Sequence, residues 1–447
     1  MKNHNPHILE GSLTKGVITL SAPIILAMFF HSLLSIVDTF WLGKVGFIAV
    51  AAVSMAWPII FILIALAVGV STGCNALVAR YVGAKNQNKS SAVASHSLAI
   101  SIIFAIVLTI MGIIFSPALF KFMGASGELL QLSVDYTNII FYGSIFTFNL
   151  FILGAILRGE GDSKTPMLIG VGINILNMVI DPLFIFTFDW GVAGAAWASI
   201  LSSLVGILFY LLYFYQGKSW VKITVRKLKL STKIIYDILA IGLPASLRNI
   251  ANAIGVFFTI KIIAAYGPEV IAAYGIGWRV EGFGVLPIVA ISLATVTIVG
   301  QNFGANNLIR AKRSAWVSSG ISMAIIALFG LFVFAFAPYV IKIFNSDPAV
   351  VDIGTAMLKI RVPAFLFAAV IMNLSSAFQA FGKSHYSLIL TVLRVTLMIG
   401  LAYLFDYYWG FNGVWWAVTF SSILMGIAIM VWYQLWQPKS VTEPIES

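Results

Sequence analysis

The sequence predicts an all-α integral membrane protein with twelve transmembrane helices, arranged as two six-helix bundles related by a pseudo-twofold axis along the membrane normal. Three observations lead to this fold class. Of the 447 residues, 60% are hydrophobic and only 10% are charged, whereas a soluble domain has about 25% charged residues. Apolar runs long enough to cross a bilayer as helices recur along the chain. The second half of the chain also repeats the pattern of the first.

Twelve apolar runs of about 20 residues qualify as membrane-spanning helices. Charged side chains are concentrated between the runs, as expected if the runs lie in lipid. The spans are predicted near residues 17–43, 48–78, 92–116, 131–156, 165–186, 192–215, 234–265, 271–299, 313–336, 352–378, 385–405 and 412–436.

Lysine and arginine side chains alternate between the two sides of the membrane in the connecting segments. One side has only Lys44, Lys121 and Lys342, whereas both termini and most basic residues fall on the other side. By the positive-inside rule the basic side is cytoplasmic, so we expect both termini in the cytoplasm and a multi-pass protein of the plasma membrane. The net charge of +11 then follows from topology and does not indicate a nucleic-acid partner.

A shift of 221 residues aligns the two halves without a gap over about 140 residues. Matched pairs include Pro23 with Pro244, Trp57 with Trp278, Gly83 with Gly304, Asn86 with Asn307, Pro117 with Pro338 and Lys121 with Lys342. We therefore predict an N-lobe over residues 1–215, a basic cytoplasmic linker over 216–233 and a C-lobe over 234–447. Two such bundles with a cleft between them are typical of alternating-access transporters. A single bundle with a pore and a membrane enzyme are the alternatives.

The first span contains a carboxylate, Asp38, well inside its apolar stretch, and a proline, Pro23, about four turns earlier. An aspartate at the centre of a spanning helix costs roughly 2.5–3.5 kcal/mol on insertion scales, so Asp38 is predicted to be a proton or cation site. Pro23 removes a backbone hydrogen bond and predicts a bend. His31, Ser35 and Asp38 are spaced at i, i+4 and i+7, on one helix face. His31 is either a substrate or proton contact or a hydrogen-bonded interior histidine.

The fifth span places Asn174, Asn177 and Asp181 at i, i+3 and i+7, again on one face. Two carboxylates from separate helices, with amide and hydroxyl oxygens around them, are able to share a proton or bind a small hard cation such as Na⁺ at Asp38 and Asp181. In the alternative, Asp181 caps the end of its helix or reaches interfacial water, and the two asparagines only join helices. The repeat partner of Asp38 is Thr259, so the acid chemistry belongs to the N-lobe.

The C-lobe differs in kind, because its charged side chains are mainly cationic. Glu281 offers the one carboxylate inside its apolar zone, and we expect it to pair with Arg248 or Arg394. These arginines form either a structural ion-pair network or a contact for an anionic group. The basic residues in or near its spans are Arg248, Lys261, Arg279, Lys359, Arg361 and Arg394.

No soluble-enzyme motif survives inspection, because the sequence has no Walker-type phosphate loop and no His-Glu-x-x-His, and its Gly-x-Ser-x-Gly string at residues 69–73 lies inside an apolar span and not at the strand-to-helix turn of a nucleophile elbow. We therefore predict that the protein is not an enzyme, uses no cofactor and draws the energy for transport from an ion gradient.

Taken together, the six-plus-six repeat, the Pro23 to Asp38 spacing, the paired Gly83 and Gly304 turns, and Asn177 with Asp181 resemble the multidrug and toxic compound extrusion (MATE) family over nearly the whole chain. Apart from Asp237 and Asp352 in their first turns, the seventh and tenth spans have no acids, and this resembles its DinF branch. The resemblance implies an antiporter that exports amphipathic organic compounds in exchange for H⁺ or Na⁺.

By the resemblance, Asp38, Asn177 and Asp181 match the N-lobe cation site, to which we add Asn174, and Pro23 matches the bend of the first helix. Ser199 stands where related members have threonine, and Leu34 stands where some members have tyrosine. The expected substrate chamber contains Met28, His31, Ser35, Arg248, Arg279, Glu281 and Arg394.

We therefore expect a cation-coupled multidrug efflux antiporter, a monomer whose partners are small organic substrates and membrane lipids. The alternative function is a flippase for a lipid-linked anionic precursor. Its anionic group would be bound by Arg248, Arg279, Arg361 and Arg394. An intramembrane transferase is a third possibility, disfavoured because no acidic cytoplasmic motif for Mg²⁺ is present.

Overall fold

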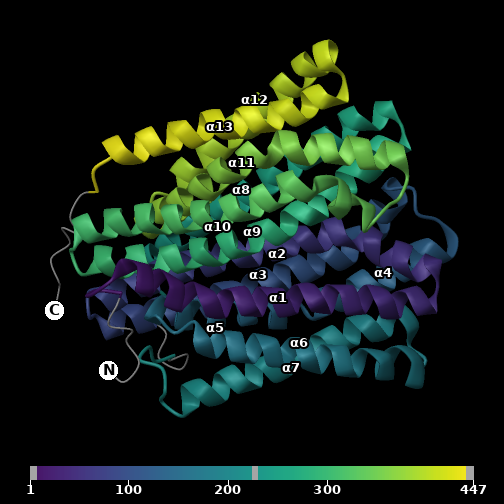
Figure 1. Ribbon diagram of the computed structural model, residues 1–447. Coiled ribbons are helices and arrows are strands. Elements are labelled where there is room, and N and C mark those ends of the chain that lie inside the picture. The colour runs from purple at the N-terminus through teal and green to yellow at the C-terminus, as the bar shows by residue number, and fades with distance from the viewer. Residues whose placement is uncertain (1–7, 224–229, 439–447) are drawn as a thin grey trace. The chain divides into compact units, whose positions relative to one another are not determined.

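The computed structural model describes residues 8–223 and 230–438. Within these ranges every regular element is a helix (Figure 1). Eleven of the helices are long and apolar enough to cross a membrane, and a bent pair makes a twelfth span. The prediction of an all-α membrane protein with twelve spans is therefore confirmed.

The helices of the first half follow the first six predicted spans. Their bounds are α1 Leu13–Val45, α2 Phe47–Gly83, α3 Gln87–Phe122, α4 Gly127–Tyr142, α5 Ser144–Glu160, α6 Lys164–Pro182, the π-helical turn η1 Leu183–Thr187, and α7 Gly191–Tyr215.

The helices of the second half follow the last six. Their bounds are α8 Thr232–Ile263, the 3₁₀ turn η2 Ala264–Tyr266, α9 Pro268–Gly304, α10 Leu308–Lys342, α11 Pro348–Ala380, α12 Ser384–Trp409 and α13 Phe411–Leu435.

The fourth span departs from a continuous helix. It consists of α4 and α5, which meet at Gly143 with a bend of 46°. Gly143 is buried, and a methyl group there would collide with the side chain of Ile200. The close approach of α7 to this glycine explains why a side chain is not tolerated at the bend.

The repeated turns after α2 and α9 have the same structure, as the repeat predicts. Lys85 and Asn306, which are 221 positions apart, both have positive φ, at 56° and 57°. Each is followed by an asparagine that caps the next helix, because Asn86 Oδ1 accepts from Lys89 N at 2.9 Å and Asn307 Oδ1 accepts from Arg310 N at 3.2 Å. The helices α3 and α10 therefore begin several residues before their apolar runs.

The chain forms two compact units. Unit 1 contains residues 22–246, and unit 2 contains residues 8–21 and 247–438. The boundaries lie next to Pro23 in α1 and Pro244 in α8, so each of these proline-containing helices contributes its first part to one unit and its remainder to the other. The linker prediction over 216–233 falls partly on residues 224–229, which lie outside the described residues.

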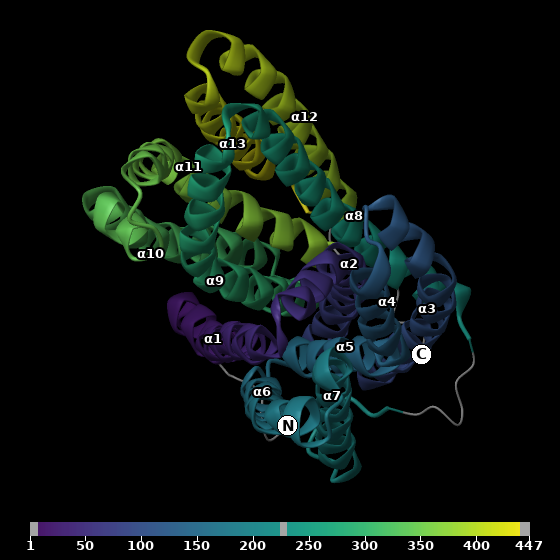
Figure 2. The same ribbon diagram turned by 90° about the vertical axis from the view of Figure 1, so that its right-hand side faces the viewer.

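In unit 1 the core lies around α2, which packs against α3, α4 and α5, while α6 and α7 form a second pair (Figure 2). Leu63, Ala67 and Phe148 are buried in this core. The first part of α8 also packs on α2 here, and glycines at the contact allow the backbones to approach.

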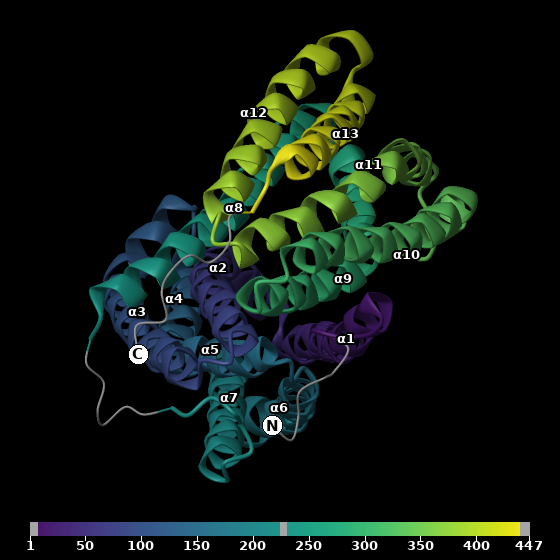
Figure 3. The same ribbon diagram turned by 90° about the vertical axis from the view of Figure 1, so that its left-hand side faces the viewer.

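In unit 2, α9, α10 and α11 pack side by side, and α12 and α13 form an antiparallel pair joined to α11 (Figure 3). The first part of α1 packs in this unit through Leu13, Val17 and Leu20, which contact Ile291 and Ile298 of α9. Asn302 Nδ2 donates to the carbonyl oxygen of Ile8 at 2.9 Å and ties down the chain before α1.

Candidate functional site

Asp38 and Asp181 meet inside unit 1. The two carboxyl groups lie within hydrogen-bonding reach of each other, one from α1 and one from the end of α6. The Asp181 side chain is only 1% exposed. Two carboxylates at this range repel one another unless a proton or a cation lies between them. The structure thus brings together the two acids singled out from the sequence.

The acids are surrounded by oxygen atoms that lack a donor. Asp38 Oδ1, both carboxylate oxygens of Asp181 and Asn177 Oδ1 are buried, and no N–H or O–H group of the described residues donates to them. Buried oxygens that can only accept are chemically suited to a shared proton or a bound cation. Asn177 Nδ2 points the other way and lies 3.5 Å from Ser199 Oγ, which places α7 beside the pair.

Asp181 does not cap a helix end, which was one alternative. Helix α6 continues through Pro182 into the π-helical turn η1, where Phe188 N donates to the carbonyl oxygen of Leu183 at 2.9 Å. The wider π turn follows because a proline cannot donate to the regular ladder. Asn174, one turn earlier on the same face, is also buried.

Tyr136 of α4 is a neighbour of the pair that sequence reasoning missed. It lies close enough to interact electrostatically with both Asp38 and Asp181, and its ring packs against the core formed by Leu42 and Ile185. The available signal was weak, because tyrosine is common at both ends of membrane spans. Its place beside the acids depends on how α4 packs against its neighbours.

The other residues predicted on α1 are arranged differently. His31 and Ser35 are exposed, Met28 and Pro23 are partly exposed, and none of the four contributes to the pocket described next. The helix is continuous through Pro23. The structure therefore brings Asp38, but not His31 or Ser35, together with the residues of α6.

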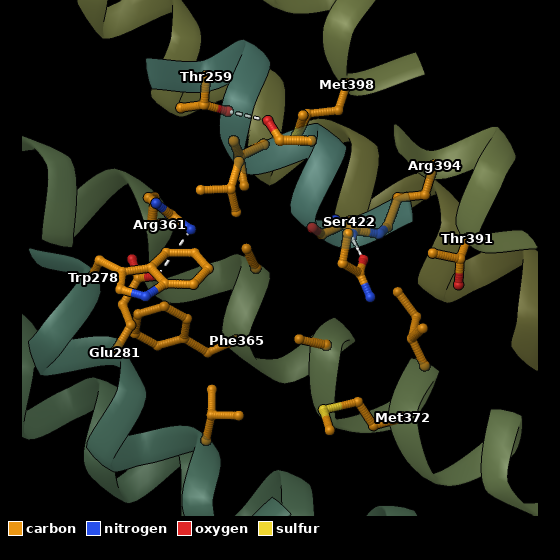
Figure 4. Close-up of a pocket in the computed structure, with 18 of the residues that line it drawn as sticks. Thr259, Trp278, Glu281, Arg361, Phe365, Met372, Thr391, Arg394, Met398 and Ser422 are labelled. Atoms are coloured by element: carbon orange, nitrogen blue, oxygen red, sulfur yellow. Dashed lines mark hydrogen bonds and ion pairs between the residues drawn. The ribbon is translucent and has the colours of Figure 1, made fainter. Parts of the chain in front are cut away.

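Unit 2 contains a pocket of about 370 Å³ between α8, α9, α11, α12 and α13 (Figure 4). Arg248, Arg361, Arg394 and Glu281 line it, with apolar and aromatic side chains between them. Arg279, which was expected in the same chamber, is exposed on α9 and lies outside the pocket lining.

The expected partners of Glu281 were wrong. Glu281 Oε2 pairs with Arg361 Nη2 at 2.8 Å, and not with Arg248 or Arg394. The helices α9 and α11 pack along much of their length, and this contact turns the two side chains toward each other. Arg394 instead donates through Nη2 to Asn252 Oδ1 at 2.6 Å.

Comparisons with known proteins agree with this geometry. The MatE family model matches the chain twice, over residues 23–183 and 244–404. The two matches start 221 residues apart, which is the shift that aligns the two halves. Multidrug export protein MepA of Staphylococcus aureus (strain N315) is 27% identical over 96% of this chain and 96% of its own length. Probable multidrug resistance protein YoeA of Bacillus subtilis (strain 168) is 26% identical over 95% of this chain and 94% of its own.

Among solved structures, the outward-facing conformation of a multidrug resistance MATE family transporter of the MOP superfamily aligns with a TM-score of 0.91 and 31% identity, covering 96% of this chain and 97% of that chain. The repeated helical fold and the match of the family model to both halves define a polytopic membrane transporter and not an enzyme. The chain belongs to the MatE family, as its sequence resemblance predicts.

Proposed function

We propose that this protein is a cation-coupled efflux antiporter that exports amphipathic organic compounds by alternating access. The observation that carries the proposal is the meeting of Asp38 and Asp181 from two predominantly apolar helices. Buried carboxylates within a membrane span are costly, and they are retained where a proton or cation is moved.

The coupling ion is H⁺ or Na⁺. Four buried oxygen atoms without a donor, from Asp38, Asp181 and Asn177, form an acceptor-only set. A proton shared between the carboxyl groups or a small hard cation satisfies such a set, whereas an organic cation is too large to enter between two groups in mutual contact. The ion and the organic substrate therefore occupy different places and compete through the conformation of the protein.

In the proposed cycle, substrate binds from the cytoplasmic side or inner leaflet while the acid pair is free of its ion. Binding of the ion from outside neutralises the pair, α1 rearranges at Pro23, and substrate leaves before the lobes return. The division of α1 next to Pro23 supports the proposed rearrangement of this helix. Because α1 packs in unit 2 before Pro23 and in unit 1 after it, a change at Asp38 is transmitted to both units.

The names of the relatives supply the substrate class. MepA is described as a multidrug export protein, and YoeA as a probable multidrug resistance protein. We accordingly propose small amphipathic organic compounds as substrates, a monomer in the plasma membrane in contact with its lipids, and both termini in the cytoplasm.

The test uses purified protein in proteoliposomes with ethidium as the transported probe. A pH gradient and a Na⁺ gradient are imposed in separate experiments, and the gradient that drives ethidium movement identifies the ion. Either substitution, Asp38→Asn or Asp181→Asn, is expected to reduce gradient-driven transport to the level of protein-free liposomes.

Asp189→Asn is the matched control. Asp189 is an exposed acid that follows α6 and the turn η1. Its φ of 56° is one that asparagine tolerates. This variant should transport at the wild-type rate. Transport by the Asp38→Asn variant that still follows the gradient would contradict the proposed role of the acid pair.

The flippase alternative has one observation in its favour, because three of its four arginines line the pocket of unit 2. The fourth, Arg279, lies outside that pocket. Since the relatives are named for multidrug export, we propose efflux as the function and treat the arginine pocket separately below.

A further inference from the structure

The pocket of unit 2 has the size of a ligand site. Its volume of about 370 Å³ is within the range of roughly 300–1,000 Å³ that holds small organic molecules. All of its lining residues belong to unit 2. Asp38 and Asp181 belong to unit 1, so the pocket is a site separate from the acid pair.

The charge of the pocket lining is positive. Three guanidinium groups line it against one carboxylate, which is a formal net charge of +2. Glu281 neutralises Arg361 at 2.8 Å, and within the described part of the chain the hydrogen-bond acceptor of Arg394 is the uncharged Asn252. For Arg248 there is no hydrogen bond or ion pair with any residue that the structure describes. Arg248 and Arg394 thus keep their charges available to a ligand.

Energetics also favour a functional role for these arginines. A cationic side chain at the centre of a membrane helix costs roughly 2.5–3.5 kcal/mol on insertion scales. The fold does not require this cost, because the repeat positions of the first half are apolar. Arg248 corresponds to Ala27 and Arg361 to Ile140. Arg394 corresponds to an isoleucine wherever the two-residue deletion is placed.

The pocket also offers an apolar and aromatic surface. Trp278 and Phe365 lie beside the Arg361–Glu281 pair, and Met372 and Met398 line other parts of the wall (Figure 4). Methionine side chains adapt to ligands of different shape, and aromatic rings bury a flat apolar body. A small inorganic anion would leave this surface uncovered.

We propose that this pocket binds an amphipathic organic anion, whose carboxylate or phosphate contacts Arg248 and Arg394 and whose apolar body lies against Trp278, Phe365 and the two methionines. Guanidinium groups suit these anions because they donate two parallel hydrogen bonds. The proposal rests on the proposed export function and deepens it by adding organic anions to the substrates, but the binding step itself requires no ion gradient.

The test is a binding measurement on the purified full-length protein in a non-ionic maltoside detergent. Dansylglycine provides a carboxylate with an aromatic body, and its methyl ester provides the same body without the charge. Calorimetry and dansyl fluorescence give both affinities. We expect saturable binding of the acid. The affinity of the ester should be lower than that of the acid by roughly tenfold or more, which is the loss expected for one charge-assisted contact.

Arg248→Gln should weaken binding of the acid by roughly tenfold or more and leave the ester unchanged. Arg248→Lys should restore part of the affinity. Lys359→Gln is the control, because Lys359 is an exposed cation on α11, two residues before Arg361, and does not line the pocket. It should bind the acid as the wild type does.

Equal binding of acid and ester, or no saturable binding of the acid, would overturn the proposal. If the Arg248 variant does not fold, the comparison of acid and ester on the wild-type protein is sufficient to decide. A second arm adds dioctanoyl phosphatidic acid or dioctanoyl phosphatidylcholine as competitor. Displacement by phosphatidic acid alone identifies a lipid headgroup as the source of the anion, and no displacement identifies a soluble organic anion. Because these experiments contain no gradient, a failure of ion coupling leaves their outcome unaffected.

Discussion

Glu281 of α9 and Arg361 of α11 form an ion pair of 2.8 Å inside unit 2. Both side chains are buried, and Glu281 Oε1 accepts no hydrogen bond from the residues that the structure describes. Each group is therefore the main neutralising partner of the other. Breaking such a pair from one side leaves an uncompensated charge, which costs more than the pair itself contributes.

Arg361→Met should destabilise the protein by about 3–5 kcal/mol, because Glu281 remains buried without its partner. Thermal unfolding in detergent measures the effect as a lower melting temperature. The double variant Glu281→Met with Arg361→Met should recover most of the loss. A double variant no more stable than the single one would show that the pair has another role.

Gly73→Ala should destabilise unit 1 by about 1–3 kcal/mol, because a methyl group there collides with the carbonyl oxygen of Ile238 in α8. The backbones of α2 and α8 would have to separate. Gly170→Ala in α6 is the control, since a methyl group at Gly170 meets no atom within 4 Å. Equal melting temperatures for the two variants would contradict this close contact.

Glu160→Ala should loosen the chain after α7. Glu160 accepts hydrogen bonds from Ser219 Oγ, Trp220 N at 3.2 Å and Val221 N at 2.9 Å, and it is itself buried. Hydrogen–deuterium exchange at residues 219–221 should become at least tenfold faster, since hydrogen bonds to a charged group contribute about 1.5–3 kcal/mol. Glu128→Ala, at an exposed acid in the first turn of α4, should leave this exchange unchanged.

Asn177→Ala should weaken binding of the proposed coupling ion by roughly tenfold, because it removes one of the oxygens around the acid pair. Ser199→Ala should have a smaller effect, since its contact with Asn177 Nδ2 is 3.5 Å and lies at the limit of a hydrogen bond. Calorimetric titration with Na⁺, or proton release on ion binding, compares the two. A larger loss for Ser199→Ala would contradict this order.

The sequence by itself determined the membrane class, the positions of the twelve spans and the division into two related halves. These properties depend on local quantities: the length of an apolar run, the chemistry of a turn, and the match of prolines, tryptophans and glycines at one shift. It also singled out Asp38 and Asp181, because an acid within an apolar run is conspicuous wherever its helix packs.

The tertiary structure alone decided which of these residues meet. The partner of Glu281, the approach of Tyr136 to the acid pair, the bend at Gly143 and the division of α1 between two units all depend on how each helix is rotated and tilted against helices that are distant in sequence. Hydrophobic pattern indicates that a residue lies in a span, but in a span that is apolar all round it does not set the helix rotation. Packing between helices sets that rotation.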